Sequence, residues 1–188
     1  MIIFMEGPDG TGKTNIAKAL ADKYDMKVYK NEAEFRLYDE DSTNKFVNLL
    51  RYSGPAEYHM VKLLSPDIIF DRNYISEYAY SKAFNRETDL ALIKAFDSLY
   101  SKLNSMVIYC YKKEYKNYKD DFIDLEKINE IDSAYRQYFD TINTLPIHMI
   151  DTTNENLSEQ IRLLSGFVEK RRYDKNVPGI KRASKYRE

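Results

Sequence analysis

The chain has 188 residues and a mass of 22.2 kDa, a length typical of one domain that buries its own core without disulfides. Hydrophobic residues make up 43% and charged residues 31% of the chain, a composition that argues against extended disorder. The formal net charge of −1 argues against binding to nucleic acid through overall charge alone. The apolar runs are far shorter than the roughly 20 residues of a membrane helix. With one cysteine, Cys110, and no segment that resembles a secretion signal, we expect a cytoplasmic protein that does not contact a membrane.

Strands and helices are predicted to alternate along the chain. Short apolar runs predict five strands, at residues 1–5, 26–29, 67–70, 105–111 and 146–150. Apolar residues at helical spacing predict helices at residues 13–24, 90–103, 125–139 and 157–168. This alternation is typical of an α/β fold with a five-stranded, mainly parallel sheet and helices on both faces, and we expect a single domain over residues 1–188. A further helical pattern at residues 41–64 contains Gly54-Pro55, which should break or kink the helix.

The first predicted strand leads into the sequence GPDGTGKT, which fits the phosphate-loop pattern G-x-x-x-x-G-K-[ST] and precedes a predicted helix. Glycines let successive backbone N–H groups turn toward an anion, and the helix N-terminus adds partial positive charge. Lys13 would neutralise the terminal phosphates, and the Thr14 hydroxyl would ligate Mg²⁺ between them. The loop therefore predicts a P-loop NTPase, nucleotide kinase-like, that binds ATP and Mg²⁺. The expected binding residues are Gly7, Asp9, Gly10, Thr11, Gly12, Lys13 and Thr14.

An acidic and a basic residue, Asp71 and Arg72, close the third predicted strand. The carboxyl ends of strands in an open parallel sheet face the ligand crevice, so both side chains should reach the site. A carboxylate there can hold Mg²⁺ through water, and a guanidinium can clamp a phosphate with two hydrogen bonds. We therefore predict Lys13, Asp71 and Arg72 as catalytic residues, and Thr14 and Asp71 as the metal site.

Two segments, EGPDGTGKT at residues 6–14 and DRNYISEYAY at residues 71–80, resemble the thymidylate kinase family, whose second segment reads D-R-[YFH]-x-x-S-x-x-A-[YF]. The resemblance implies that Asp71 assists magnesium and the acceptor phosphate, that Arg72 holds this phosphate, and that residues 76–80 line the base pocket. It also places the adenine near residues 151–154, with Thr152 as a contact. Thymidylate kinases are commonly dimers, which suggests a homodimer. The expected acceptor-binding residues are Asp9, Arg36, Arg51, Arg72, Ser76 and Tyr80.

The chain departs from the family pattern in two places. The family's R-E-P motif after the second strand is missing, and residues 30–36 read KNEAEFR instead. The expected lid, at about residues 112–124, carries lysines where family members usually carry arginines, and lysine lacks the planar fork of arginine. A basic tail follows at about residues 170–188.

Several acceptors are compatible with these motifs. An anionic monophosphate needs positioning and charge neutralisation, which the motifs offer, so we rank a deoxynucleoside monophosphate such as dTMP first. A deoxynucleoside ranks second, because its hydroxyl benefits from a carboxylate base, for which Glu32 or Glu34 is a candidate. A modified base in DNA, held by the basic tail, ranks below these small molecules. A non-kinase P-loop NTPase ranks last, because the guanine-reading N-K-x-D pattern is absent.

Overall fold

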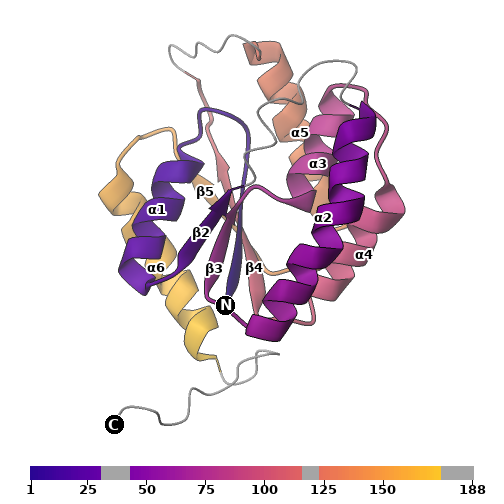
Figure 1. The fold of residues 1–188 in the computed structure, drawn as a ribbon. Coiled ribbons are helices and arrows are strands. Elements are labelled where there is room, and N and C mark those ends of the chain that lie inside the picture. The colour runs from indigo at the N-terminus through magenta and orange to yellow at the C-terminus, as the bar shows by residue number, and fades with distance from the viewer. Residues whose placement is uncertain (31–42, 116–122, 175–188) are drawn as a thin grey trace.

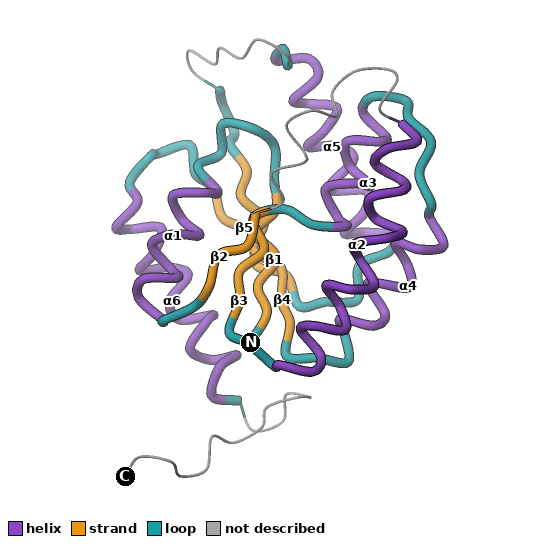
Figure 2. The backbone as a smooth tube through the Cα atoms, viewed as in Figure 1, coloured by secondary structure: helices purple, strands orange, loops and turns teal. Residues whose placement is uncertain are grey.

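The computed structural model describes residues 1–30, 43–115 and 123–174. Its centre is a sheet of five strands that all run parallel, in the order β2-β3-β1-β4-β5 (Figure 2). The apolar strand β1 takes the middle place, where both of its edges are paired. The predicted parallel α/β sheet is confirmed. The strands are β1 (Ile2–Glu6), β2 (Lys27–Lys30), β3 (Ile68–Asp71), β4 (Ser105–Tyr111) and β5 (Ile147–Asp151).

Helices cover both faces of the sheet, as expected for parallel strands joined by crossover helices. Figure 1 shows them in two groups, one on each face. The first group is α1 (Lys13–Tyr24) and α6 (Leu157–Tyr173). The second group is α2 (Thr43–Leu64), α3 (Tyr74–Ala83), α4 (Leu90–Tyr100) and α5 (Leu125–Thr141).

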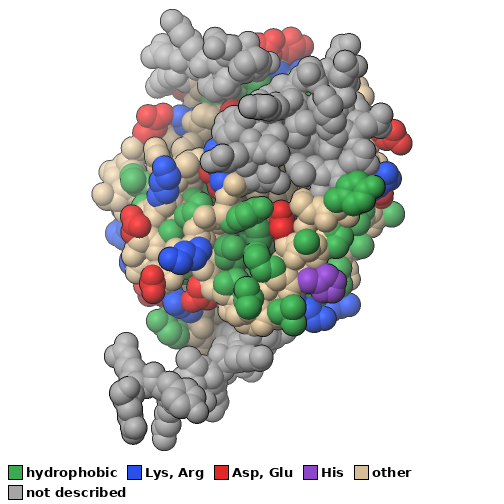
Figure 3. Space-filling view, in the orientation of Figure 1, with side chains coloured by type: hydrophobic (Ala, Val, Ile, Leu, Met, Phe, Trp, Pro, Cys, Tyr) green, Lys and Arg blue, Asp and Glu red, His purple; other side chains and the backbone are tan. Residues whose placement is uncertain are grey.

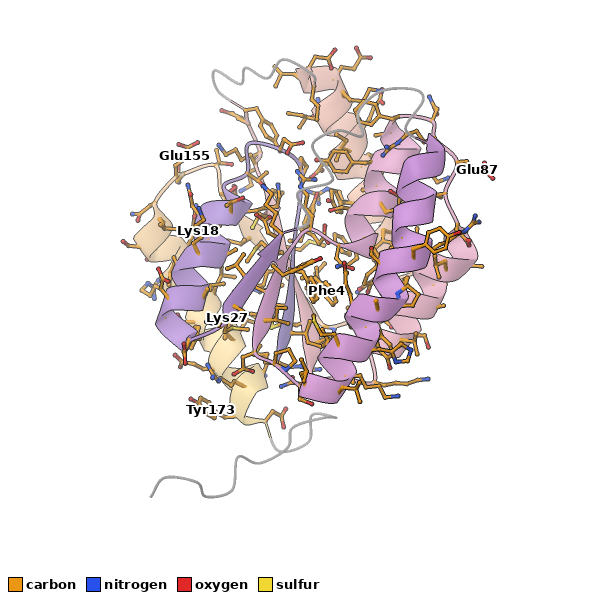
Figure 4. The ribbon with its side chains drawn as sticks, viewed as in Figure 1. Phe4, Lys18, Lys27, Glu87, Glu155 and Tyr173 are labelled. Carbon is orange, nitrogen blue, oxygen red and sulfur yellow. The ribbon has the colours of Figure 1, made fainter. Side chains whose placement is uncertain are left out.

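Alternate side chains of β1 build the two halves of the core. Ile3 and Met5 pack toward α1 and α6, whereas Ile2 and Phe4 pack toward the larger helix group. Figure 4 shows Phe4 between the sheet and α2. Its ring stacks on Phe70 at 5.4 Å between centroids. Both faces of β1 are therefore buried, which holds the loop that follows it on a rigid strand.

The expected break at Gly54-Pro55 is wrong, because α2 is one helix from Thr43 to Leu64 with Pro55 inside it. A Cβ placed on Gly54 would lie 2.6 Å from Cζ of Phe96 in α4. The missing side chain thus allows close packing of α2 on α4. Tertiary packing routinely overrides local helix preference, here against a proline cost of about 3 kcal/mol.

Helix α3 was not predicted as a separate element. It begins directly after the Asp71-Arg72 pair, with Asn73 as its N-cap, whose side chain accepts a hydrogen bond from the Tyr74 N–H. Nine of its ten residues are buried, so its sequence shows little helical amphipathicity. Asn73, a residue type that favours the N-cap position, was the feature of the sequence from which the start of α3 could have been predicted.

The face shown in Figure 3 exposes several apolar side chains. Val28 and Tyr29 of β2 and Met60 of α2 are among the exposed large hydrophobic residues of the protein. Single exposed apolar residues are ordinary on protein surfaces. Within the described ranges, no helix is both long and apolar enough to cross a membrane.

Candidate active site

The phosphate loop connects β1 to α1 at the carboxyl edge of the sheet. Gly7, Gly10 and Gly12 have φ angles of 141°, 74° and 75°, a range that side-chain-bearing residues rarely adopt. At Gly7 a Cβ would also lie 2.1 Å from the carbonyl oxygen of Cys110 on β4. The loop therefore needs glycine both for its backbone angles and for its close approach to the neighbouring strand.

Lys13 is buried within its own loop, with 6% of its surface exposed. Its Nζ donates to the Pro8 carbonyl at 2.5 Å and to the Thr11 hydroxyl at 3.3 Å. Burial disfavours the charged ammonium, and the nearby Arg72 cation adds to this, so the pKa of Lys13 falls to about 8. A bound phosphate would favour the charged form, which makes this lysine a site for an anion.

Thr14 and Asp71, the two predicted metal ligands, lie in direct contact. The Thr14 hydroxyl donates to Oδ2 of Asp71 at 2.7 Å, although the residues are 57 positions apart. Hydroxyl and carboxylate oxygens are the ligands that Mg²⁺ prefers, and they fit an ion that takes its other ligands from water and phosphates. Among the described residues, no group of three or more His, Cys, Asp or Glu forms a complete metal cage. The donor set therefore suits Mg²⁺ delivered with a nucleotide.

Arg72 reaches back to the phosphate loop. Its guanidinium pairs with the Asp9 carboxylate and lies 4.7 Å from the centroid of the Tyr80 ring. The Tyr80 hydroxyl donates to the other oxygen of Asp9 at 2.7 Å. Burial opposes ionisation of Asp9, but the charges of Arg72 and Lys13 outweigh it, so the pKa of Asp9 lies below its usual value. Residues from both predicted motifs thus form one charged cluster.

This cluster surrounds a cavity of about 160 Å³. Two lining residues, Asn15 and Lys30, were not predicted. Lys30 ends β2, beside Asp71 in the register of the sheet, and its Nζ lies 4.0 Å from Oδ2 of Asp71. Its place at the carboxyl end of a strand was the signal that could have identified it. The cavity is lined by Asp9, Gly10, Gly12, Lys13, Thr14, Asn15, Lys30, Asp71 and Arg72.

Ser76 lies inside the protein rather than along this cavity. Its hydroxyl donates to Glu6, a fully buried carboxylate at the end of β1, and lies 2.8 Å from the Tyr135 hydroxyl. Glu6 was not among the predicted site residues. Only the topology reveals its contacts, because Ser76 and Tyr135 are far away in sequence.

Two other predicted residues bond elsewhere. Thr152 is buried and donates through both its N–H and its hydroxyl to the Tyr111 carbonyl, at 2.8 and 3.1 Å. Arg51 lies on the exposed side of α2 and pairs with Asp89 at 2.9 Å. Neither residue lines the cavity.

Some predicted features lie outside the described residues. These are Arg36, the candidate bases Glu32 and Glu34, residues 116–122 of the expected lid, and residues 175–188 of the basic tail.

A protein-family model described as "AAA domain" matches residues 2–160. No curated protein matches the chain in sequence. Among solved structures, the YorR protein of Bacillus subtilis, in complex with phosphorylated GDP, is 19% identical; the match covers 93% of this chain and 99% of that one, with a TM-score of 0.65. The deoxyadenosine kinase of M. mycoides, with dCMP and dCDP bound, is 19% identical over 90% of this chain and 100% of that one, with a TM-score of 0.61. The thymidylate kinase of Ehrlichia chaffeensis is 18% identical over 90% and 98%, with a TM-score of 0.57. These likenesses show that the chain has the fold of the P-loop nucleotide kinases.

Proposed function

The chain belongs to the AAA domain family, and we propose that it is a kinase that transfers a phosphoryl group from ATP to a deoxynucleoside monophosphate. The observation that supports this proposal is the meeting of both motifs at one cavity, where Thr14 bonds Asp71 and Arg72 pairs with Asp9. A phosphate loop alone would serve many nucleoside triphosphatases. A guanidinium and a carboxylate on the opposite wall add a place for an acceptor phosphate.

The residues from the two motifs have distinct roles in this proposal. The loop amides and Lys13 would hold the ATP phosphates, while Thr14 and Asp71 would hold Mg²⁺. When bound, the metal ion would neutralise charge on the β- and γ-phosphates. Arg72 would exchange its Asp9 partner for the acceptor phosphate and bring it in line with ATP. Thr152 remains our proposed contact on the adenine side, and Tyr80 on the acceptor side.

The charge around the cavity supports a monophosphate as acceptor. Lys13, Lys30 and Arg72 supply three cations around the cavity against the two carboxylates of Asp9 and Asp71, and this positive balance suits an acceptor that is itself anionic. Two solved proteins with this fold are named as a thymidylate kinase and a deoxyadenosine kinase, which supports phosphoryl transfer to a deoxynucleotide or deoxynucleoside.

The test is a product analysis. The protein is incubated with ATP, Mg²⁺ and, separately, deoxynucleosides, deoxynucleoside monophosphates and DNA, and the products are identified by mass spectrometry. We expect deoxynucleoside diphosphates, with dTMP among the accepted monophosphates. Phosphorylated deoxynucleosides or DNA would replace the proposed acceptor, and release of inorganic phosphate without a phosphorylated acceptor would contradict the kinase. A Lys13→Ala preparation controls for contaminating kinases.

A further inference from the structure

The chain makes an unusual turn between β3 and α3. Arg72 has a φ angle of 71°, in the left-handed region, which costs a residue with a side chain about 1–2 kcal/mol. Strained backbone of this kind persists only where surrounding contacts hold it. The turn directs the Arg72 side chain toward Asp9 and Tyr80.

Two consecutive residues of β1 hold this turn. The Arg72 N–H donates to the Met5 carbonyl at 3.1 Å, and the Asn73 N–H donates to Oε1 of Glu6 at 3.0 Å. The second bond is charge-assisted and is shielded from water, since Glu6 is fully buried. Both amides that flank the left-handed residue are thus fixed by the strand that carries the phosphate loop.

Other contacts hold the Glu6 carboxylate in place. Its second oxygen accepts from the hydroxyls of Ser76 on α3 and of Tyr135 on α5, the latter at 3.0 Å. A buried carboxylate is costly, and an apolar residue at this position would often give a more stable protein. Stability therefore does not explain why a glutamate occupies position 6. Its position between Gly7 and the turn at Arg72 gives a better explanation.

We infer that Glu6 is a positioning residue that, through the Asn73 amide, holds the left-handed turn at Arg72 and so sets where the guanidinium meets the acceptor phosphate. This inference rests on the proposed kinase function. Without the carboxylate, Arg72 would relax toward an ordinary φ angle, and its side chain would move away from Asp9. ATP binding should be little affected, because the Glu6 side chain bonds the turn, α3 and α5, whereas the phosphate loop is held by its own glycines and by Lys13.

The chain offers a matched control three residues along α5. The Tyr138 hydroxyl donates to the buried carboxylate of Asp97 at 2.6 Å, which is the same chemistry as the Tyr135–Glu6 bond. The Asp97 network joins α4 to α5, to Thr144 and to the Tyr74 hydroxyl at the start of α3, and none of its described bonds involves Arg72 or Asn73.

The experiment compares Glu6→Gln, Tyr135→Phe and Tyr138→Phe in steady-state kinetics with the accepted monophosphate, and measures ATP affinity by calorimetry. Glu6→Gln should raise the acceptor KM about tenfold, equal to about 1.4 kcal/mol, and should leave the ATP Kd within twofold. Tyr135→Phe should raise the acceptor KM less, because the Asn73 bond remains. Tyr138→Phe should lower Tm without changing the acceptor KM. The inference is overturned if Glu6→Gln raises the acceptor KM no more than Tyr138→Phe, or if ATP affinity falls by the same factor.

A crystal structure of Glu6→Gln separates this inference from the proposed function. We expect Arg72 to leave the left-handed region or its guanidinium to leave Asp9. A variant that keeps both features overturns the inference, whether or not an acceptor has been identified. A wild-type protein that phosphorylates no acceptor would refute the kinase alone, and the variant structure would still decide the role of Glu6 at the turn.

Discussion

At the scale of single residues, burial controls the chemistry of the candidate site. Lys13 has a pKa of about 8 because the loop shields it from water and Arg72 lies nearby. It is therefore mostly charged at neutral pH, yet an anion would stabilise its charge further. The pKa of Asp9 lies below its usual value. Burial opposes ionisation of this carboxyl, but the charges of Arg72 and Lys13 favour the carboxylate and outweigh burial.

Replacing Lys13 by methionine should keep the packing of the side-chain stem and remove its charge. We expect turnover of ATP to fall by about 10²–10³-fold or more, as losses of preorganised charge commonly do. The matched control is Lys18→Met on the same helix, because Lys18 is exposed on the outer side of α1 (Figure 4) and should leave turnover unchanged. The measurement is the rate of ATP turnover with the accepted monophosphate. Equal rates for Lys13→Met and Lys18→Met would refute the assignment of the phosphate loop.

Glu77 on α3 should make the stability of the protein depend on pH. Burial raises the pKa of its carboxyl to about 7, and the bond from Ser81 and the charge of Arg86 only partly oppose this shift. One carboxyl oxygen, Oε2, has no hydrogen-bond partner in the described part of the chain. The contribution of Glu77 to stability is therefore fully present below the unfolded pKa of about 4.5 and is lost as pH rises through about 7.

Glu77→Gln, which resembles the protonated acid, should match the wild type at pH 4, below the unfolded pKa, and exceed its stability at pH 8. The gain should reach a few kcal/mol at most, because each pKa unit corresponds to about 1.4 kcal/mol. Urea unfolding at the two pH values measures it. Glu87→Gln serves as the control, because Glu87 is exposed near the start of α4 (Figure 4). A difference between Glu77→Gln and wild type that is the same at both pH values would disprove the assigned shift.

At the scale of elements, the approach of α2 to α4 depends on one missing side chain. Helix propensity alone would favour alanine over glycine at residue 54 by about 1 kcal/mol. The Phe96 ring, which is buried, occupies the place where the new methyl group would lie. Packing and propensity therefore oppose each other at this position.

We expect Gly54→Ala to destabilise the protein by about 1–3 kcal/mol, because overpacking outweighs the gain in helix propensity. Gly166→Ala in α6 makes the same chemical change where a Cβ meets nothing within 4 Å, and it should stabilise the protein by up to about 1 kcal/mol. Thermal and urea unfolding of both variants provide the comparison. A Gly54→Ala protein as stable as Gly166→Ala would show that α2 and α4 separate without cost.

At the scale of the whole molecule, the order of the strands creates the site. β3 lies directly beside β1, so the carboxyl ends of these two strands bring Asp71 and Arg72 to the phosphate loop. β2 lies on the other side of β3 and adds Lys30. A ligand in this crevice would join the ends of three neighbouring strands, β1, β2 and β3, so binding should stabilise the fold.

ATP with Mg²⁺ should therefore raise Tm. At an ATP concentration 100 times the Kd, the expected stabilisation is about 2.7 kcal/mol. Removal of Mg²⁺ with EDTA should reduce the shift, because Thr14 and Asp71 would then lack the ion that links them to the phosphates. Differential scanning calorimetry tests both points. The Lys13→Met variant should show little shift, and an equal shift in this variant would argue against binding at the loop.

The sequence by itself determined the parts that depend on local pattern. Strand β4 matches its predicted bounds and α1 begins at the predicted residue, because an apolar run or a period of 3.6 residues is a property of a short segment. The phosphate loop is equally local, since its glycines, lysine and threonine are neighbours in the chain. The parallel sheet followed from the alternation of these elements.

Only the tertiary structure decided the parts that depend on contacts between distant segments. Ser76 bonds Glu6, which lies 70 positions away. Glu6 in turn bonds Tyr135, which lies 129 positions away, and no pattern within a segment reports such a pairing. Pro55 lies inside α2, next to Gly54, whose missing side chain allows close packing on Phe96 of α4. The physical reason is the same in each case: local pattern reflects backbone geometry, whereas the partner of a buried polar or small residue depends on which surfaces the folded chain brings together.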